Sequence, residues 1–406
     1  MRWSCVGLLL VANLAGNAVE AELSPLSPNI FDEWRAGYRA RAVLREKPLE
    51  DHIARSTRQG RFPKGGRSLQ EKIDEVNGFL DRELMIEEQR GVGVSGAIVY
   101  QDKVLFSKGY GLSKADDPSS KMTSSTLFQI GSVSKTFISL GIAILVEEGK
   151  MSWDDPVKKL FASFRLYDKY AEEYATVGNL CAMNSGLNDL PSIGRFFGLY
   201  PTDEDLMPGL AFIEPAHTLR GGHDYANANF AVLGQVIKSV TGKSWDVFLK
   251  ERIWEPLGMT RTFPSAFDAQ GDNDTSYGHF LCGGDLFGPY DLVNDPEAQL
   301  AGHGKGQKIA AGSTLSSSDD LATLLRLILN KGTVDGVTIL KDPASVTKMI
   351  TGKYAVNKEF MEQFLIEGHQ FYPDGNTLAS GYGFDYVGVG QWVTRMSTKV
   401  AILQCT

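Results

Sequence analysis

The stretch Gly131-Ser132-Val133-Ser134-Lys135 is followed closely by the apolar run 137–146, and these residues decide how the fold is interpreted. The run predicts a long buried helix that begins close to Ser132. The side chains of Ser132 and Lys135 are three residues apart, so on a helix they share one face about one turn apart. A lysine amine can take the proton of a serine hydroxyl when apolar surroundings lower the pKa of the amine. The stretch therefore predicts a serine nucleophile with a lysine partner.

The Ser-x-x-Lys pattern also has a purely structural interpretation, because serine and lysine are common surface residues. The predicted helix start adds a second feature. The first backbone N–H groups of a helix have no partner within the helix, so they are able to stabilise an oxyanion beside Ser132. The choice between the two interpretations depends on the rest of the chain.

The length and composition limit the class of protein. A chain of 406 residues has room for one large domain or two ordinary ones. Hydrophobic residues make up 43% and charged residues 22%, as in a soluble globular protein. The formal net charge of −8 predicts a solvated acidic surface and argues against nucleic acid as the main partner.

Residues 1–21 have the pattern of a secretory signal peptide. A short positive start, Met1-Arg2-Trp3, precedes the mostly apolar run 6–15, and Val19-Glu20-Ala21 carries small residues at the positions before a cleavage site. The apolar run is too short to span a bilayer, and no other stretch is long and apolar enough to do so. The sequence therefore predicts a secreted protein that is cleaved near Ala21 and has no stable membrane insertion.

Two further regions follow the predicted signal peptide. Residues 22–67 contain four prolines and many arginines without sustained periodicity, which predicts a basic, flexible leader: a pro-segment, an electrostatic tether or a plain linker. Ser68-Leu69-Gln70-Glu71 has the form of a capping box and predicts a helix start. Residues 94–100 and 103–107 predict a β-hairpin, so residues 68–406 form the predicted folded domain, with the helix of Ser132 against the sheet.

Cysteines and histidines give no sign of a metal site. Cys181, Cys282 and Cys405 remain after the predicted signal peptide is removed, which allows one disulfide with one free thiol or buried free thiols. His217 and His223 are six residues apart without a nearby carboxylate pair. No metal site is therefore expected.

Tyr225 and Asn227 form a second pair of candidate site residues. A tyrosine hydroxyl beside a lysine ammonium loses its proton more easily and can act as a base toward a serine. An asparagine two residues later can both donate hydrogen bonds to a substrate amide and accept them from it. Taken alone, Tyr225-Ala226-Asn227 is better explained by a simple helix start than by a catalytic role.

Further short segments occur in one order along the chain, and the whole set resembles the class C β-lactamases and penicillin-binding-protein-like serine hydrolases. The resemblance spans roughly residues 70–386 and rests on these segments: Phe128 to Phe137, Val146 to Lys150, Asp155-Pro156-Val157, Asn184-Ser185-Gly186-Leu187, Tyr225-Ala226-Asn227, Leu233-Gly234, Pro256-Leu257-Gly258-Met259, Ala311-Gly312 and Asp320-Leu321-Ala322.

The resemblance implies an α+β fold of the β-lactamase/transpeptidase type. In such a fold an antiparallel sheet flanked by helices accompanies an inserted, mostly helical region, and the active site lies between them. Ser132 is then the acylated nucleophile, Lys135 assists its deprotonation, Tyr225 is the general base, and Asn227 orients Lys135 and the substrate amide. The expected substrate is a small molecule, a peptide or an ester, with β-lactams, D-peptides and esters all open. The resemblance also implies that no metal and no organic cofactor is needed. The oligomeric state stays open.

The sequence departs from the family pattern near its C-terminal end. The family carries Lys-Thr-Gly or His-x-Gly on a strand beyond a Tyr-Gly-Phe-like segment, and no such triplet follows Gly381-Tyr382-Gly383-Phe384. His303-Gly304-Lys305-Gly306 has similar letters but precedes Ala311, so it is interpreted as a glycine-rich loop. We therefore expect a C-terminally truncated domain with incomplete strands. The alternative function is a catalytically impaired homologue that binds peptide or acyl ligands.

Overall fold

The structure is a computed structural model of the chain. It describes residues 68, 70–71, 73–74, 77–78, 92–100, 102–190, 200, 202–282, 285–294, 308–351, 354–355, 377–383, 385–388 and 400–405. The predicted signal peptide, the predicted leader and the glycine-rich loop at 303–306 lie outside the described residues.

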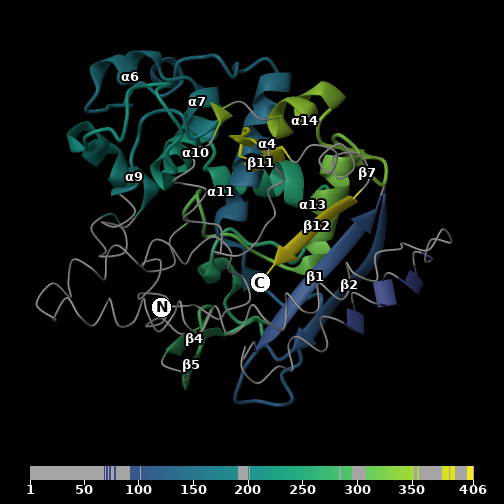
Figure 1. The fold of residues 1–406 in the computed structure, drawn as a ribbon. Coiled ribbons are helices and arrows are strands. Elements are labelled where there is room, and N and C mark those ends of the chain that lie inside the picture. The colour runs from purple at the N-terminus through teal and green to yellow at the C-terminus, as the bar shows by residue number, and fades with distance from the viewer. Residues whose placement is uncertain are drawn as a thin grey trace, which may run out of the picture.

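A three-stranded antiparallel sheet forms one part of the molecule. Strand β1 (Gly93–Tyr100) lies between β2 (Lys103–Gly111) and β12 (Val400–Cys405), which brings segments from both ends of the described chain together (Figure 1). Ala97 of β1 pairs with Ser107 of β2 and with Leu403 of β12. The predicted hairpin is therefore confirmed, and its second strand continues through Gly111.

Helix α13 (Ser318–Leu329) covers one face of this sheet. Its side chains Ala322 and Leu325 pack against Ala97 and Val99 of β1 in a small apolar cluster. The Oγ of Ser317 caps the helix by accepting a hydrogen bond from the N–H of Asp320 at 3.3 Å. The expectation that the helix of Ser132 lies against the sheet is corrected, because α13 lies there instead.

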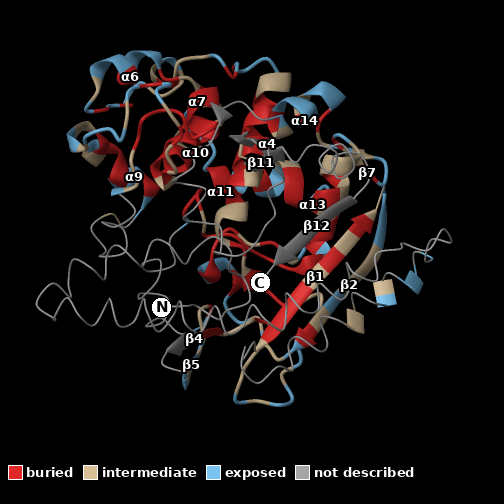
Figure 2. Cartoon of the chain, in the orientation of Figure 1, coloured by how far each residue is buried: buried red, intermediate tan, exposed pale blue. Residues whose placement is uncertain are grey.

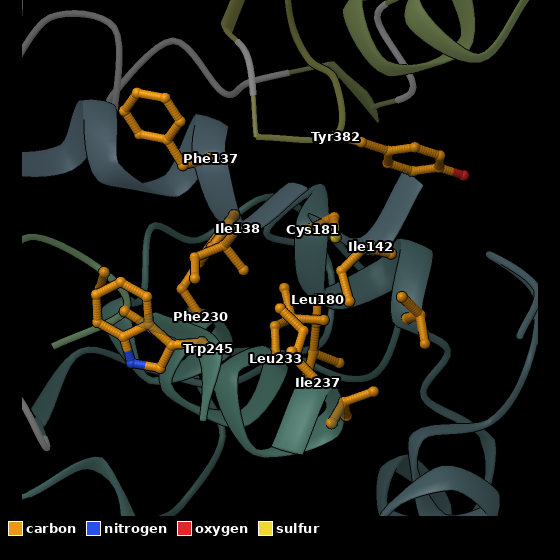
Figure 3. Packing of buried hydrophobic residues seen from close by; sticks show 14 of the residues in the cluster. Phe137, Ile138, Ile142, Leu180, Cys181, Phe230, Leu233, Ile237, Trp245 and Tyr382 are labelled. Atoms are coloured by element: carbon orange, nitrogen blue, oxygen red, sulfur yellow. The ribbon is translucent and has the colours of Figure 1, made fainter. Parts of the chain in front are cut away.

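Helix α4 (Ser134–Glu147) is the centre of the helical part and packs on α10 (Asn227–Thr241), α11 (Trp245–Leu249) and α14 (Pro343–Ile350). Phe137, Ile138, Leu233 and Ile237 are fully buried between these helices (Figure 3). Figure 2 shows α4 and α10 buried along much of their length, whereas α6 is largely exposed. Burying a side chain of this size contributes about 1.5–3 kcal/mol, which explains why an apolar run became the central helix.

Shorter elements surround the central helices and connect them to the sheets. The short helices and turns are η1 (Gly131–Val133), α5 (Val157–Leu160), α6 (Lys169–Tyr174), α7 (Val177–Cys181), α9 (Asp203–Leu206), η2 (Met207–Phe212), η3 (Lys250–Trp254) and η4 (Ala266–Ala269). The short paired strands are β3 (Phe128–Gln129) with β6 (Leu315–Ser316), β4 (Gly278–Cys282) with β5 (Asp285–Tyr290), β7 (Thr333–Val334) with β8 (Val337–Thr338), and β10 (Thr377–Ser380) with both β9 (Tyr354–Ala355) and β11 (Asp385–Gly388).

Two helix ends lie where the residues of the sequence predict them. The N–H of Glu71 donates to the Oγ of Ser68 at 3.2 Å and the N–H of Ser68 donates to Glu71 Oε2 at 2.5 Å, so the predicted capping box is confirmed. Helix α10 ends at Gly242, which has the left-handed conformation expected of a glycine stop. Helix α4 begins at Ser134, two residues later than Ser132, because the 3₁₀ turn η1 precedes it.

The sequence Gly381-Tyr382-Gly383-Phe384-Asp385-Tyr386 predicts a strand that begins at Gly381, but strand β11 begins at Asp385. Residues 381–383 form a bend in which Gly383 has a φ of 73°, a conformation outside the extended region. The ring of Tyr382 stacks on Trp153 with centroids 4.4 Å apart, and the N–H of Gly383 donates to the Cys181 carbonyl at 3.1 Å. Packing against the helical part therefore bends the chain before the strand starts.

The described ranges contain neither a membrane-spanning helix nor a cluster of metal ligands. None of the helices described there is long and apolar enough to cross a membrane. No group of three or more potential metal ligands occurs among the residues that the structure describes.

Candidate active site

Ser132 and Lys135 meet at the start of the central helix. Ser132 lies in η1 and Lys135 in the first turn of α4, and Lys135 Nζ donates to Ser132 Oγ at 2.9 Å. Lys135 is only 4% exposed, although its charged group is of the kind that normally stays in water. Its Nζ also lies 4.9 Å from the centroid of the Tyr225 ring and 5.7 Å from that of Phe230. The predicted nucleophile and its lysine are thus in direct contact.

Tyr225 and Asn227 complete the predicted group from the start of α10. The hydroxyl groups of Tyr225 and Ser132 share a hydrogen bond of 2.5 Å, in which either oxygen can donate. Lys135 Nζ donates to the Tyr225 hydroxyl at 2.7 Å and to Asn227 Oδ1 at 2.8 Å. The structure therefore brings all four predicted site residues together, although 90 residues separate Lys135 from Tyr225 in the sequence.

A backbone group that the sequence did not reveal is the carbonyl of Ala311, which accepts a hydrogen bond from Lys135 Nζ at 2.7 Å. Its segment is fixed on both sides: the N–H of Ala310 donates to Asp203 Oδ2 at 2.9 Å, and the N–H of Ile130 donates to the Thr314 carbonyl at 3.0 Å. In the sequence, Ala311-Gly312 contributes to the family resemblance but indicates no contact with Lys135. A carbonyl leaves no side-chain pattern, so the sequence carried no signal for its role.

The acceptors around Lys135 restrict what its nitrogen can do. Asn227 Oδ1 and the Ala311 carbonyl can only accept hydrogen bonds, so each takes one N–H of the lysine. The two hydroxyl groups, on Ser132 and Tyr225, lie at the remaining positions around Nζ. A neutral lysine would then direct its lone pair at the proton of a hydroxyl group. A charged lysine would instead donate its third N–H to a hydroxyl oxygen. The arrangement is suited to moving a proton between serine, tyrosine and lysine.

Two titratable groups precede Tyr225 in the sequence, and burial shifts both. His223 is 4% exposed, and this burial lowers its pKa to about 4, with the neighbouring His217 acting in the same direction. Burial likewise raises the pKa of the Asp224 carboxyl above its ordinary value. His223 is therefore neutral at pH 7 and supplies no positive charge behind Tyr225.

The three cysteines that follow the predicted signal peptide are a separate set of groups that the sequence singles out. Cys181 is a buried free thiol in α7, and burial raises its pKa, which makes it an inert core residue. The cysteine side chains at 282 and 405 lie outside the described residues. The two alternatives for them, a disulfide or buried free thiols, therefore stay predictions.

Comparison with known proteins places this chain in a family. The beta-lactamase family model matches residues 70–392. Among curated relatives, unguisins hydrolase ungD' of Aspergillus campestris is 30% identical over 221 residues, which cover 52% of this chain and 40% of that protein. Protein flp of Staphylococcus aureus strain MRSA252 is 28% identical over 239 residues, 59% of this chain and 45% of flp. The chain thus spans less than half the length of these two relatives.

Solved structures show the same fold. The octameric penicillin-binding protein homologue from Pyrococcus abyssi has a TM-score of 0.61 and 25% identity, covering 82% of this chain and 73% of that one. EstCE1, a hydrolase with promiscuous acyltransferase activity, has a TM-score of 0.63 at 17% identity, covering 83% of this chain and 94% of that one. The family match over most of the chain and the likeness of fold lead to one conclusion. This chain belongs to the beta-lactamase family, whose members are serine hydrolases, and has the β-lactamase/transpeptidase-like fold.

Proposed function

We propose that this protein is an exported serine hydrolase that forms an acyl-enzyme at Ser132 on an amide or ester substrate. The observation that carries the proposal is the position of Lys135 Nζ, buried and within 2.9 Å of both Ser132 Oγ and the Tyr225 hydroxyl. Burying a lysine costs free energy unless its partners compensate for the lost water. A structural role alone would not require that the compensating partners include a serine and a tyrosine that also bond to each other.

In the acylation step, Ser132 Oγ attacks the substrate carbonyl carbon, and its proton passes to the pair formed by Tyr225 and Lys135. Collapse of the tetrahedral intermediate breaks the C–N or C–O bond, and the same pair returns the proton to the leaving nitrogen or oxygen. Water then attacks the acyl ester, releases the acid and restores the Ser132 hydroxyl. The backbone N–H of Ser132, within the first turn η1, is the group that would donate to the oxyanion.

The second candidate function is a catalytically impaired homologue that binds peptide or acyl ligands at the same site. A sequence observation favours it: residues 385–406, which follow Gly381-Tyr382-Gly383-Phe384, contain no Lys-Thr-Gly or His-x-Gly triplet. In the family pattern that triplet lies on the strand that supplies a second oxyanion donor. Removing one oxyanion donor typically lowers turnover about 10²- to 10³-fold. This candidate predicts ligand binding with little or no turnover.

Labelling with a fluorescent penicillin, together with hydrolysis of p-nitrophenyl acetate and D-phenylalanine p-nitroanilide, tests the proposal. We expect a covalent adduct on the peptide that contains Ser132, found by mass spectrometry, and turnover of at least one substrate. Ser132→Ala should abolish the adduct and lower turnover about 10⁴-fold or more. The matched control is Ser239→Ala, which removes an α10 hydroxyl that donates to the Leu160 carbonyl at 2.8 Å, away from the site.

The outcomes separate the two candidates. An adduct or turnover that disappears in Ser132→Ala but persists in Ser239→Ala supports the serine hydrolase. Stabilisation of the fold by the penicillin without any adduct or turnover supports the impaired homologue. Turnover that persists in Ser132→Ala contradicts acylation at this residue.

Export is a separate part of the proposal and has its own test. Residues 1–21 have the charge, apolar run and small residues of a secretory signal peptide. Expression of the full chain in a secreting host, followed by N-terminal sequencing of the protein in the medium, should give a chain that begins at Glu22. Protein retained in the cell with Met1 intact would contradict it.

A further inference from the structure

Asp189 contacts the site through Asn227. Asp189 Oδ1 accepts a hydrogen bond from the backbone N–H of Asn227 at 2.8 Å. The side-chain Nδ2 of Asn227 lies 3.3 Å from Oδ1 and 3.3 Å from Oδ2 of the same carboxylate. Asp189 therefore holds both the backbone and the side chain of the residue that bonds to Lys135.

The chemistry of the three groups fixes the orientation of the Asn227 amide. A carboxylate can only accept hydrogen bonds, so the NH₂ group of the amide has to face Asp189. The lysine nitrogen donates, so the amide oxygen has to face Lys135, as the 2.8 Å contact with Oδ1 shows. An amide rotated by 180° would place NH₂ against Lys135 and its oxygen against a carboxylate, losing both sets of hydrogen bonds. The carboxylate thus selects the rotamer that presents an acceptor to the lysine.

The loop that carries Asp189 is itself fastened to the start of α10. Ser185 Oγ donates to Asn229 Oδ1 at 2.6 Å, and both residues are buried. Gly186 has a φ of 87°, and a Cβ there would lie 2.4 Å from the His217 carbonyl oxygen, so the turn requires glycine. Helix α10 also lacks a side-chain cap from its own N-cap residue, Ala226. The Asp189 carboxylate takes over that task from a neighbouring loop while it holds the catalytic amide.

We propose that Asp189 is a positioning residue that sets the orientation of the Asn227 amide toward Lys135. This inference rests on the proposed acylation at Ser132 for its catalytic consequence. It gives a role to the loop that follows Asn184-Ser185-Gly186-Leu187: the loop delivers a carboxylate to the first residue of α10. Asp189 acts through Asn227 and is not itself a reacting group.

A double-mutant cycle on p-nitrophenyl acetate hydrolysis tests the inference with Asp189→Ala, Asn227→Ala and the double variant. We expect Asp189→Ala to lower kcat about 10- to 100-fold with little change in KM, because a misplaced catalytic group costs rate rather than binding. Asp189→Asn retains one acceptor oxygen for the Asn227 N–H and should give an intermediate kcat. In the Asn227→Ala background, Asp189→Ala should lower kcat by less than twofold further.

The matched control is Asp168→Ala. Asp168 Oδ1 accepts hydrogen bonds from the N–H groups of Tyr170 and Ala171 at the start of α6, so the control removes the same kind of helix cap away from the site. Its kcat should stay within twofold of the wild type. Equal losses of kcat in Asp168→Ala and Asp189→Ala, or full additivity with Asn227→Ala, would overturn the inference. So would wild-type kinetics in Asp189→Ala.

A second measurement does not depend on activity. Selective ¹⁵N labelling of asparagine gives the side-chain NH₂ resonances, and Asn227→Ala identifies the pair that belongs to Asn227. We expect Asp189→Asn, which preserves the shape of the side chain, to shift that pair, and Asp168→Ala to leave it in place. An unshifted pair would overturn the positioning role. If the wild type fails to turn over or bind any probe, the proposed function fails, and the resonance still decides whether Asp189 orients Asn227.

Discussion

The most unusual single residue in the molecule is Lys135, a buried lysine surrounded by oxygen atoms. Four oxygens lie within 2.9 Å of its Nζ, two of them carbonyl oxygens that can only accept. The carbonyls of Asn227 and Ala311 hold the amine in one place and leave its remaining position to the two hydroxyl groups. The lysine is thus held by two carbonyl oxygens and directed at the two hydroxyl groups to which we assign the reaction.

Replacing Lys135 with methionine tests this division of roles. Lys135→Met keeps the apolar stem but removes the group that takes part in proton transfer, so the rate of Ser132 acylation should fall about 10²- to 10⁴-fold. The rate of covalent labelling by the fluorescent penicillin is the measurement. Lys238→Met is the control, because Lys238 is half-exposed on the same helix as Asn227 and bonds to Glu204 at 2.6 Å. Labelling of Lys135→Met at the wild-type rate would exclude the lysine from the acylation step.

At the scale of elements, the short helix α6 is held by ionic contacts to a buried carboxylate. Glu172 of α6 is buried and accepts hydrogen bonds from Lys158 Nζ at 2.6 Å and Lys169 Nζ at 2.9 Å. The N–H of Leu166 donates to the same carboxylate at 2.9 Å. Burial alone would raise the pKa of Glu172, but the hydrogen bonds from Lys158 and Lys169 outweigh it and lower the pKa to about 2.

The low pKa of Glu172 makes the stability of this region decrease at acidic pH. The ordinary value is 4.5 and the folded value about 2, so the unfolded chain binds the proton more readily. The stabilising contribution is therefore complete above about pH 5 and is lost as the pH falls through about 2. Thermal unfolding of the wild type and Glu172→Gln should differ most at pH 6–7, and the difference should shrink toward pH 2. A difference that stays constant over this range would contradict the ionic origin.

At the scale of the whole molecule, segments from distant parts of the chain close the structure. Strand β12 pairs with β1, and the bend at 381–383 packs against α4 and α7 (Figure 1). Tyr382 is buried, stacks on Trp153, and its N–H donates to the Met349 carbonyl at 2.9 Å. A late segment of the chain thus supports the helix whose first turn carries Lys135.

Removing the Tyr382 ring tests how much this closure contributes. Tyr382→Ala should lower the free energy of unfolding by about 3 kcal/mol, because it leaves a cavity beside Trp153 and loses the stacked contact. Urea denaturation followed by tryptophan fluorescence is the measurement. Tyr174→Ala is the control: its ring is 55% exposed on α6, and its removal should change the stability by less than about 0.5 kcal/mol. Equal effects of the two changes would show that the bend contributes no stability.

The sequence by itself determined the pieces whose physics is local. The apolar run 137–146 predicted α4, the capping box at 68–71 predicted a helix start, and the segments 94–100 and 103–107 predicted the hairpin of β1 and β2. The order of short segments indicated the family, which the family model confirmed. Ser132, Lys135, Tyr225 and Asn227 were recognisable as candidates because their side chains have the proton-transfer and hydrogen-bonding groups that the proposed reaction needs.

Only the tertiary structure decided how those pieces meet. It placed α13 rather than α4 on the sheet, and it bent residues 381–383 where a strand was predicted, because both outcomes depend on packing between distant segments. It also brought the Ala311 carbonyl to Lys135 and the Asp189 carboxylate to Asn227. A backbone carbonyl and a single loop aspartate have no distinguishing pattern in a sequence. Each contributes through a hydrogen bond to a residue far away in the sequence, and only the fold brings such residues within hydrogen-bonding distance.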